Sequence, residues 1–141
     1  MKNWNGASLD EIREVFSLFD DWEDRYRYLI DLANSLPPMD DSLKNDETFV
    51  RGCTSRVWMA SDFKDGNIHF IADSDAHIVK GLIGLLMAIY NDKPVSTLHE
   101  LPIETIFAEL GLSQNISPNR RNGFFAMVEK LKTESNKQNK E

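Results

Sequence analysis

Residues 74–90, SDAHIVKGLIGLLMAIY, are the stretch of this sequence that decides the fold. Its apolar residues recur at helical spacing at Ile78, Val79, Leu82, Ile83, Leu85, Leu86 and Ile89. A helix built from them has almost no polar face, and such a helix is buried in the middle of a protein rather than laid on its surface. Ser74 precedes it and is suited to cap its first turn. We therefore predict a central helix after Ser74, with the other elements packed around it.

Helical spacing of apolar residues also appears on both sides of this central stretch. A capping box that begins at Ser8 predicts the first helix, and two prolines after Leu36 end the second. Gly111 is placed to end a short helix, and Ser117 followed by a proline is typical of the start of another. These signals predict helices over residues 9–19, 22–36, 103–110 and 118–131, with a short turn at residues 97–100.

Between the second helix and the central helix the pattern changes to that of β-structure. The segments that carry it are a short strand from 49, a strand at 56–63, an Asp-Gly turn at 64–67 and a return strand at 68–72. The fold class is therefore α+β, with a small antiparallel sheet of about three strands packed against several helices. We expect a single domain over residues 1–141, with frayed tails at about residues 1–7 and 133–141.

The composition disfavours several classes of partner and of protein. Sixteen lysines and arginines stand against 23 aspartates and glutamates, and the net charge of −7 disfavours nucleic acid or an anionic membrane as a partner. The single cysteine can form no disulfide within the chain. The longest apolar run, residues 81–90, is far shorter than the ~20 residues of a membrane span. We therefore expect a soluble protein of the cytoplasm, either a monomer or a weak homodimer.

Cys53, the single cysteine, has neighbours that distinguish it from a cysteine in a core. In general a lone cysteine is more often a small buried apolar residue than a nucleophile. Here Gly52 permits a turn, and Arg51 and Arg56 lie two residues before and three residues after the thiol. Guanidinium groups near a thiol favour the thiolate, which is its nucleophilic form. The local sequence leaves both interpretations open.

Two arginines in the first turn of the last predicted helix break a local rule. The N-terminal end of a helix dipole is positive and favours Asp or Glu, but Arg120 and Arg121 stand there. Such an exception indicates an anion for them to meet, which is a carboxylate of Asp73 or Asp75 or the Cys53 thiolate. The alternative is a pair of solvated arginines on an acidic surface.

The sequence contains no other group of residues that predicts a catalytic or ligand-binding site. His69, His77 and His99 lack the spacing of a zinc site, and the sequence has no glycine-rich phosphate loop. No histidine pairs convincingly with Cys53 as a catalytic base. The sequence therefore predicts neither a metal site nor a phosphate site on this chain.

Four motifs, in chain order, resemble those of the SufE/CsdE-type sulfur-acceptor proteins, the partners of group II cysteine desulfurases in iron–sulfur cluster assembly. The most specific is GCTSRVW at residues 52–58, which is similar to the family pattern G-C-x-S-x-V-W. The others are WEDRYRYLI at 22–30, DSDAHIVKGL at 73–82 and SPNRRNG at 117–123. Together they extend the resemblance over about residues 9–132.

The resemblance implies a fold shared with the IscU-type scaffold proteins and a function for Cys53. The motif cysteine of such proteins accepts sulfane sulfur from the persulfide of a desulfurase of the SufS or CsdA type. Cys53 is therefore expected to become a persulfide and to pass its sulfur to an iron–sulfur scaffold or another acceptor. The chain would be an activator and co-substrate of the desulfurase rather than an autonomous enzyme. Pyridoxal phosphate is expected on the desulfurase, and no cofactor on this chain.

Other residues are expected to support Cys53. They are Gly52, Arg56, Asp75 and Arg120. Asp75 matches the second aspartate of the D-S-D motif, and Arg120 matches the motif arginine, so the resemblance implies that both lie near the cysteine. Arg121 departs from the small polar residue of the family pattern, and its role stays open.

Two other functions fit the same residues. Cys53 could be the thiol of a redox enzyme or sensor, which would form a sulfenic acid with peroxide in the absence of a desulfurase. The chain could also be an interaction module whose Cys53 is buried and inert. Rapid reaction with peroxide favours the first alternative, and slow labelling by a small thiol reagent favours the second.

Overall fold

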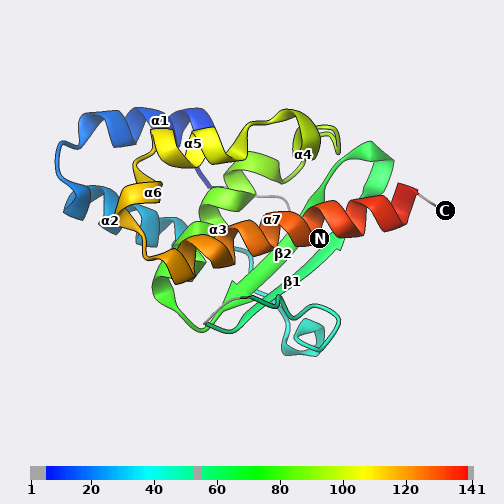
Figure 1. Cartoon of the computed structure of the whole chain (residues 1–141). Helices are drawn as coiled ribbons and strands as arrows, with labels where there is room; N and C mark the ends of the chain where they lie inside the picture. The colour runs from blue at the N-terminus through cyan, green and yellow to red at the C-terminus, as the bar shows by residue number, and fades with distance from the viewer. Residues whose placement is uncertain (1–5, 53–54, 140–141) are drawn as a thin grey trace.

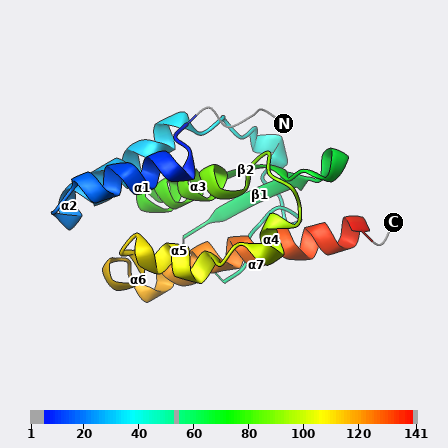
Figure 2. The same ribbon diagram turned by 90° about the horizontal axis from the view of Figure 1, so that it is seen from above.

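The computed structural model describes residues 6–52 and 55–139, and it has the α+β fold class that the sequence predicts. Its elements in chain order are α1 (Leu9–Leu18), α2 (Trp22–Asp31), η1 (Leu32–Ser35), η2 (Asp41–Leu43), β1 (Val57–Asp62), η3 (Lys64–Gly66), β2 (His69–Ser74), α3 (His77–Tyr90), α4 (Thr97–Glu100), α5 (Ile103–Glu109), α6 (Leu112–Asn115) and α7 (Pro118–Asn139) (Figure 1). Seen from above, α3 and the β1–β2 hairpin form a middle layer, with α1 and α2 on one side and α5 and α7 on the other (Figure 2).

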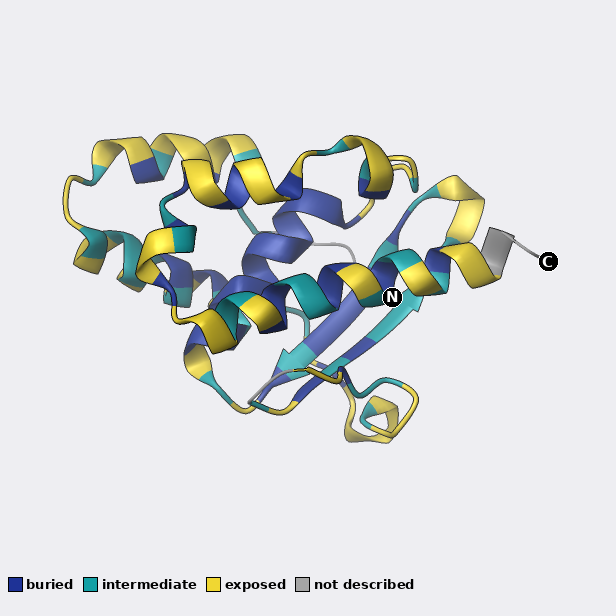
Figure 3. Cartoon of the chain, viewed as in Figure 1, coloured by how far each residue is buried: buried dark blue, intermediate teal, exposed yellow. Residues whose placement is uncertain are grey.

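The predicted central helix, α3, is the centre of the hydrophobic core. Every residue of α3 except His77 and Lys80 is buried, as expected for a helix that is apolar on nearly every side (Figure 3). It contacts α1, α2, β2 and α7. The cap of α3 differs from the prediction, because Ala76 is the residue that precedes the first turn. Ser74 Oγ accepts a hydrogen bond from the Ala76 amide at 3.2 Å and so shapes the turn before the helix.

In the described residues the sheet is a hairpin of two strands, smaller than the predicted sheet of about three. Its antiparallel register pairs Val57 with Ser74 at one end and Asp62 with His69 at the other. Phe49, which was expected to begin a strand, forms an isolated bridge with Trp58 and continues no further as a strand. The hairpin therefore brings the start of β1, just after the Cys53 segment, beside the end of β2.

The remaining helices agree with the prediction except at four places. The second predicted helix tightens into the 3₁₀ turn η1 before the prolines end it. Neither α6 nor the 3₁₀ turn η2 has a counterpart in the sequence prediction. α7 continues through Asn139, whereas we expected the chain to fray from about residue 133. Within the described part of the chain, no helix combines the length and apolar character needed to cross a membrane.

Candidate functional site

The segment that contains Cys53 connects Val50 to β1, and backbone hydrogen bonds hold both of its ends. Val50 N donates to Val57 O at 2.8 Å, and Met59 N donates to Thr48 O at 2.7 Å. Cys53 itself lies outside the described residues. The structure therefore fixes where this segment leaves and rejoins the fold, and the candidate site is built from the described residues around it.

Gly52 has the backbone conformation that its place before Cys53 requires. Its φ angle is +91°, in the left-handed region that favours glycine. A Cβ at this position would lie 3.8 Å from Ala126 Cβ, which is an ordinary contact, so the need for glycine is conformational rather than steric. The same distance shows that the chain just before Cys53 lies against α7.

A hollow of about 160 Å³ lies beside this segment, where β1, α3 and the first turns of α7 meet. It is lined by Ser55, Val57, Val79, Ser117, Asn119, Arg120 and Gly123. The two valines give the hollow an apolar wall, and the serines, Asn119 and Arg120 give it a polar one. Because Ser55 is one of the lining residues, the hollow adjoins the segment of Cys53.

Arg120 is placed in this hollow by the start of α7. Ser117 Oγ accepts a weak hydrogen bond from the Arg120 amide at 3.4 Å, so the predicted Ser-Pro cap is present. The Nη1 atom of Arg120 is buried and has no hydrogen-bond partner among the described residues. A buried guanidinium N–H without a partner is costly, and functional sites are one place where such a cost is found. Arg120 thus lines the hollow and also carries a buried donor without a partner among the described residues.

Asp75 forms hydrogen bonds with the backbone of Arg56 and not with its guanidinium group. Arg56 N donates to Asp75 Oδ1 at 3.1 Å, and Asp75 N donates to Arg56 O at 3.3 Å. This reciprocal pair joins the β2–α3 turn to the position three residues after Cys53. Asp75 therefore holds the backbone at Arg56, and within the described residues it forms no ion pair with Arg120 or Arg121.

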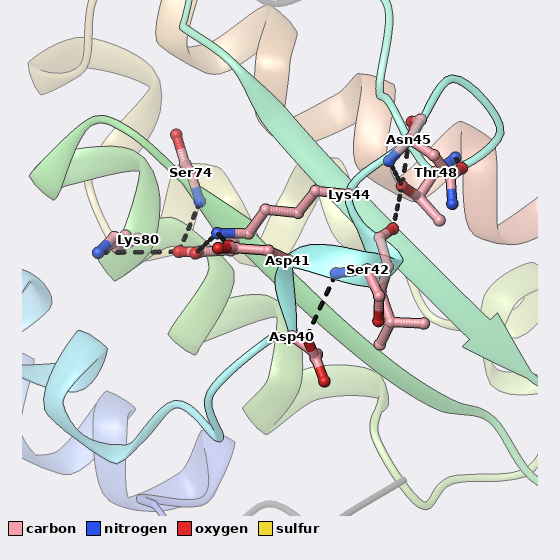
Figure 4. Close-up of polar contacts among 10 residues, drawn as sticks. Asp40, Asp41, Ser42, Lys44, Asn45, Thr48, Ser74 and Lys80 are labelled. Atoms are coloured by element: carbon pink, nitrogen blue, oxygen red, sulfur yellow. Dashed lines mark hydrogen bonds and ion pairs between the residues drawn. The ribbon is translucent and has the colours of Figure 1, made fainter.

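Asp73 has partners that the sequence did not indicate. Its carboxylate lies 2.8 Å from Lys44 Nζ and 3.7 Å from Lys80 Nζ, and one of its oxygens accepts the Ser74 amide at 2.8 Å (Figure 4). Asp73 was one of the anions expected to meet the α7 arginines, and it pairs with these two lysines instead. Lys44 stands 29 positions earlier in a polar loop, so no local pattern could have identified it.

The Lys44–Asp73 pair fastens the loop before the Cys53 segment to the sheet. Lys44 Nζ also lies 5.4 Å from the centre of the Trp58 ring, a cation–π distance, and Trp58 meets Phe49 edge to face at 6.2 Å. Burial raises the pKa of Asp73, but the hydrogen bonds from Lys44 and the Ser74 amide outweigh it, and the net pKa is below the usual range. The hydrogen bond to Asp73 raises the pKa of Lys44.

Replacing Asp73 with asparagine should therefore lower stability in a pH-dependent way. The lowered pKa of Asp73 contributes stability above its unfolded value of about 3.9, and that contribution is lost as the pH falls through the folded pKa. At pH 7 we expect Asp73→Asn to cost about 1 kcal/mol of unfolding free energy, and the difference from the native chain should shrink as the pH falls below about 3.9. Urea unfolding at pH 7, 5 and 3 measures it.

Asp41→Asn is the matched control for this prediction. Asp41 also approaches Lys44, at 3.4 Å, but its side chain is 96% exposed. An exposed pair contributes little, so this variant should unfold like the native chain at every pH. A loss of stability in Asp73→Asn that stays the same down to pH 3 would contradict the role given to its charge.

Three comparisons with known proteins agree with this fold and motif set. The model of the SufE family, described as an Fe-S metabolism associated domain, matches residues 10–135. An uncharacterized SufE-like protein of Rhizobium etli is 41% identical over 133 residues, which are 92% of this chain and 90% of that protein. A second one, from Rhizobium meliloti, is 39% identical and covers 92% of this chain and 95% of its own.

A solved structure shares the fold at lower sequence identity. The solution structure of a hypothetical protein from Thermus thermophilus superimposes with a TM-score of 0.76 at 21% identity, and the match covers 94% of this chain and 96% of that one. This likeness concerns the fold alone. The family model and the two relatives extend over most of the sequence, and the chain therefore belongs to the SufE family, whose domain is associated with Fe–S metabolism.

Proposed function

We propose that this chain accepts sulfane sulfur from the persulfide of a group II cysteine desulfurase onto Cys53 and delivers it for iron–sulfur cluster assembly. The observation that carries the proposal is Arg120, which lines a hollow next to the segment of the single cysteine and whose buried Nη1 atom has no partner among the described residues. A guanidinium donor at such a place suits an anionic sulfur, because it favours thiolate over thiol. Membership of a family associated with Fe–S metabolism supports the same function.

The proposed step is an exchange between sulfur atoms. The Cys53 thiolate attacks the outer sulfur of the desulfurase persulfide, a new S–S bond forms at Cys53, and the original S–S bond breaks. The desulfurase cysteine leaves as a thiolate, so no external oxidant or reductant is needed. As in thiol–disulfide exchange, the rate depends on the thiolate fraction, on the leaving thiol and on access.

The hollow gives a persulfide a suitable place to rest. Its volume of about 160 Å³ exceeds the ~30 Å³ that one water molecule occupies, so an outer sulfur atom fits. Val57 and Val79 supply an apolar wall that limits access of water and oxidants, and Arg120 supplies a donor to the charge. The chain itself then needs no cofactor, and the pyridoxal phosphate of the overall reaction belongs to the desulfurase.

The mass of the Cys53 peptide tests the proposal. The purified chain is mixed with a group II cysteine desulfurase, pyridoxal phosphate and L-cysteine, and the peptide is then weighed. We expect a gain of about 32 Da that dithiothreitol removes, whereas the same nominal gain surviving dithiothreitol would be sulfinic acid. An unchanged mass with an active desulfurase would overturn the proposal.

Replacing Arg120 with glutamine should slow sulfur uptake by about three- to tenfold, because loss of a nearby positive charge raises a thiol pKa by about one unit. The rate of alkylation of Cys53 by iodoacetamide, followed against pH, measures that pKa directly. Arg121→Gln is the matched control, since Arg121 does not line the hollow. An alkylation profile of Arg120→Gln identical to that of the native chain would show that Arg120 has no effect on the thiol.

A further inference from the structure

A second hollow, of about 200 Å³, lies where α1, α2 and the end of α5 meet. None of the residues that line it lines the hollow beside the Cys53 segment. A ligand of this second hollow would therefore be separate from the sulfur chemistry of Cys53. The second hollow is lined by Arg13, Phe16, Ser17, Arg25, Glu109 and Leu110.

Arg25 is held in place at the second hollow by three neighbours. Its Nε donates to Phe19 O at 3.0 Å, and its guanidinium group lies 5.8 Å from the centre of the Phe16 ring, which is a cation–π distance. On another side, its Nη1 atom would lie 3.7 Å from a Cβ at Gly111. A side chain that is already restricted in this way loses less entropy when a ligand binds.

The guanidinium group of Arg25 keeps donors for a ligand. It has five N–H donors, and the contact with Phe19 O uses one of them. Among the described residues the two Nη atoms form no ion pair, and neither is a buried atom without a partner, so both face solvent. Lys64 and Lys93 also lack an ion pair, but neither lines this hollow. The planar guanidinium group of Arg25 is suited to the two oxygens of a carboxylate.

Glu109 supplies a negative charge to the same hollow. Its Oε2 lies 3.5 Å from Arg13 Nη2, longer than the ~2.7–2.9 Å of a strong charge-assisted hydrogen bond, and its side chain is 53% exposed. The Glu109 carboxylate can therefore accept hydrogen bonds from a second cation. A phosphate would be repelled by Glu109 and by the net charge of −7. A molecule that carries one carboxylate and one ammonium group meets both Arg25 and Glu109.

The size and the remaining walls of the second hollow restrict the ligand further. Phe16 and Leu110 are buried residues of the core, and they give the hollow an apolar surface between its charges. Its volume corresponds to about six or seven water molecules at ~30 Å³ each, which is comparable to the number of non-hydrogen atoms in a small amino acid.

We propose that the second hollow binds a small α-amino acid as its zwitterion. The carboxylate lies on Arg25, the ammonium group lies on Glu109, and a small side chain lies against Phe16 and Leu110. This site goes beyond the proposed sulfur transfer. It also gives a role to Arg25 in the motif WEDRYRYLI at residues 22–30, which the chemistry of Cys53 does not use.

The test is a titration of the ¹⁵N-labelled native chain with L-alanine and, separately, with propionate, which is L-alanine without its amino group. We expect L-alanine to shift the amide signals of Ser17 and Gly111 with a dissociation constant of about 1 mM, and propionate to bind about five- to tenfold more weakly. No shift of these signals up to about 50 mM L-alanine would overturn the proposal. Equal binding of propionate would overturn the recognition of the ammonium group.

Glu109→Gln tests the contact with the ammonium group. This variant should bind L-alanine about five- to tenfold more weakly and propionate no more weakly than the native chain, so that the preference for L-alanine disappears. Glu104→Gln is the matched control, because Glu104 is exposed on the same helix and does not line the hollow. Equal weakening by Glu104→Gln, or an unchanged preference in Glu109→Gln, would contradict the role of Glu109.

Arg25→Lys tests the contact with the carboxylate. Lysine keeps the positive charge but not the planar pair of donors, so both ligands should bind at least about tenfold more weakly. Arg27→Lys is the control on the same helix, since Arg27 is exposed and does not line the hollow. Circular dichroism checks the fold, and Glu109→Gln still tests the site if Arg25→Lys unfolds. Native binding by a folded Arg25→Lys would overturn the proposal.

Cys53→Ser separates this inference from the proposed function. It should bind L-alanine like the native chain, because the second hollow shares no lining residue with the hollow beside the Cys53 segment. Loss of binding in Cys53→Ser would place the amino acid at the cysteine and overturn the second hollow as its site.

Discussion

Serine at position 53 is expected to abolish sulfur uptake, so that no persulfide is detected on the chain, and to remove its stimulation of the desulfurase. A serine hydroxyl stays protonated at neutral pH and does not take part in sulfur exchange, which requires a thiolate. Because Cys53 is the single cysteine of the sequence, no other thiol can replace it. The peptide mass and the rate of L-cysteine consumption measure the two losses.

The exchange of one sulfur for one oxygen is small enough to leave the fold intact, and thermal unfolding of Cys53→Ser should confirm this. Ser61→Ala, near the far end of β1, is the control and should take up sulfur like the native chain. Stimulation that persists in Cys53→Ser would mean that the chain activates the desulfurase by binding alone. The function as a sulfur acceptor would then be wrong.

The sequence predicted most helices of this fold because helical periodicity is local information. α3 is the clearest example, since its apolar residues alone indicated a helix buried in the centre. The polar end of α7 predicts fraying, but the structure continues the helix through Asn139. Residues 124–141 contain neither glycine nor proline, and Glu134 lies within ion-pair distance of both Lys130 and Lys137. Polar residues that form helices well and pair in this way extend a helix.

The candidate site was predictable only in part. Motifs indicated Cys53 and Arg120, and the Ser-Pro cap correctly placed Arg120 in the first turn of α7. The sequence did not predict which anion Arg120 faces, because that depends on how segments distant in the chain pack together. Asp73 is held by Lys44, and Asp75 is held by the backbone of Arg56. Contacts between residues 19 to 29 positions apart leave no periodic signal in the sequence.

Alanine at position 81 is expected to cost about 2–4 kcal/mol of unfolding free energy, although alanine favours a helix over glycine by about 1 kcal/mol. Gly81 faces α2 across the core. A Cβ there would overlap the carbonyl oxygen of Leu29, and it would lie 2.9 Å from the carbonyl carbon and 3.2 Å from Ile30 N. These are backbone atoms of a helix, so the overlap can be relieved only if α2 and α3 move apart.

Gly84, one turn later, shows that the close approach continues along α3. A Cβ there would lie 2.8 Å from Leu32 Cβ in η1, so both glycines face the same neighbouring segment. Interiors packed as densely as crystals of small molecules absorb such a shift poorly. The cost of Gly81→Ala is therefore the cost of separating two helices rather than of bending one side chain.

Urea unfolding measures this cost, and Gly66→Ala is the control that separates overlap from backbone strain. Gly66 has a φ angle of +79° with nothing within 4 Å of a Cβ, so alanine there should cost only about 1–2 kcal/mol. Stability of Gly81→Ala equal to that of the native chain would show that α2 and α3 separate easily. Because α3 also carries Val79 to the hollow, a shift of α3 in the variant should slow sulfur uptake as well.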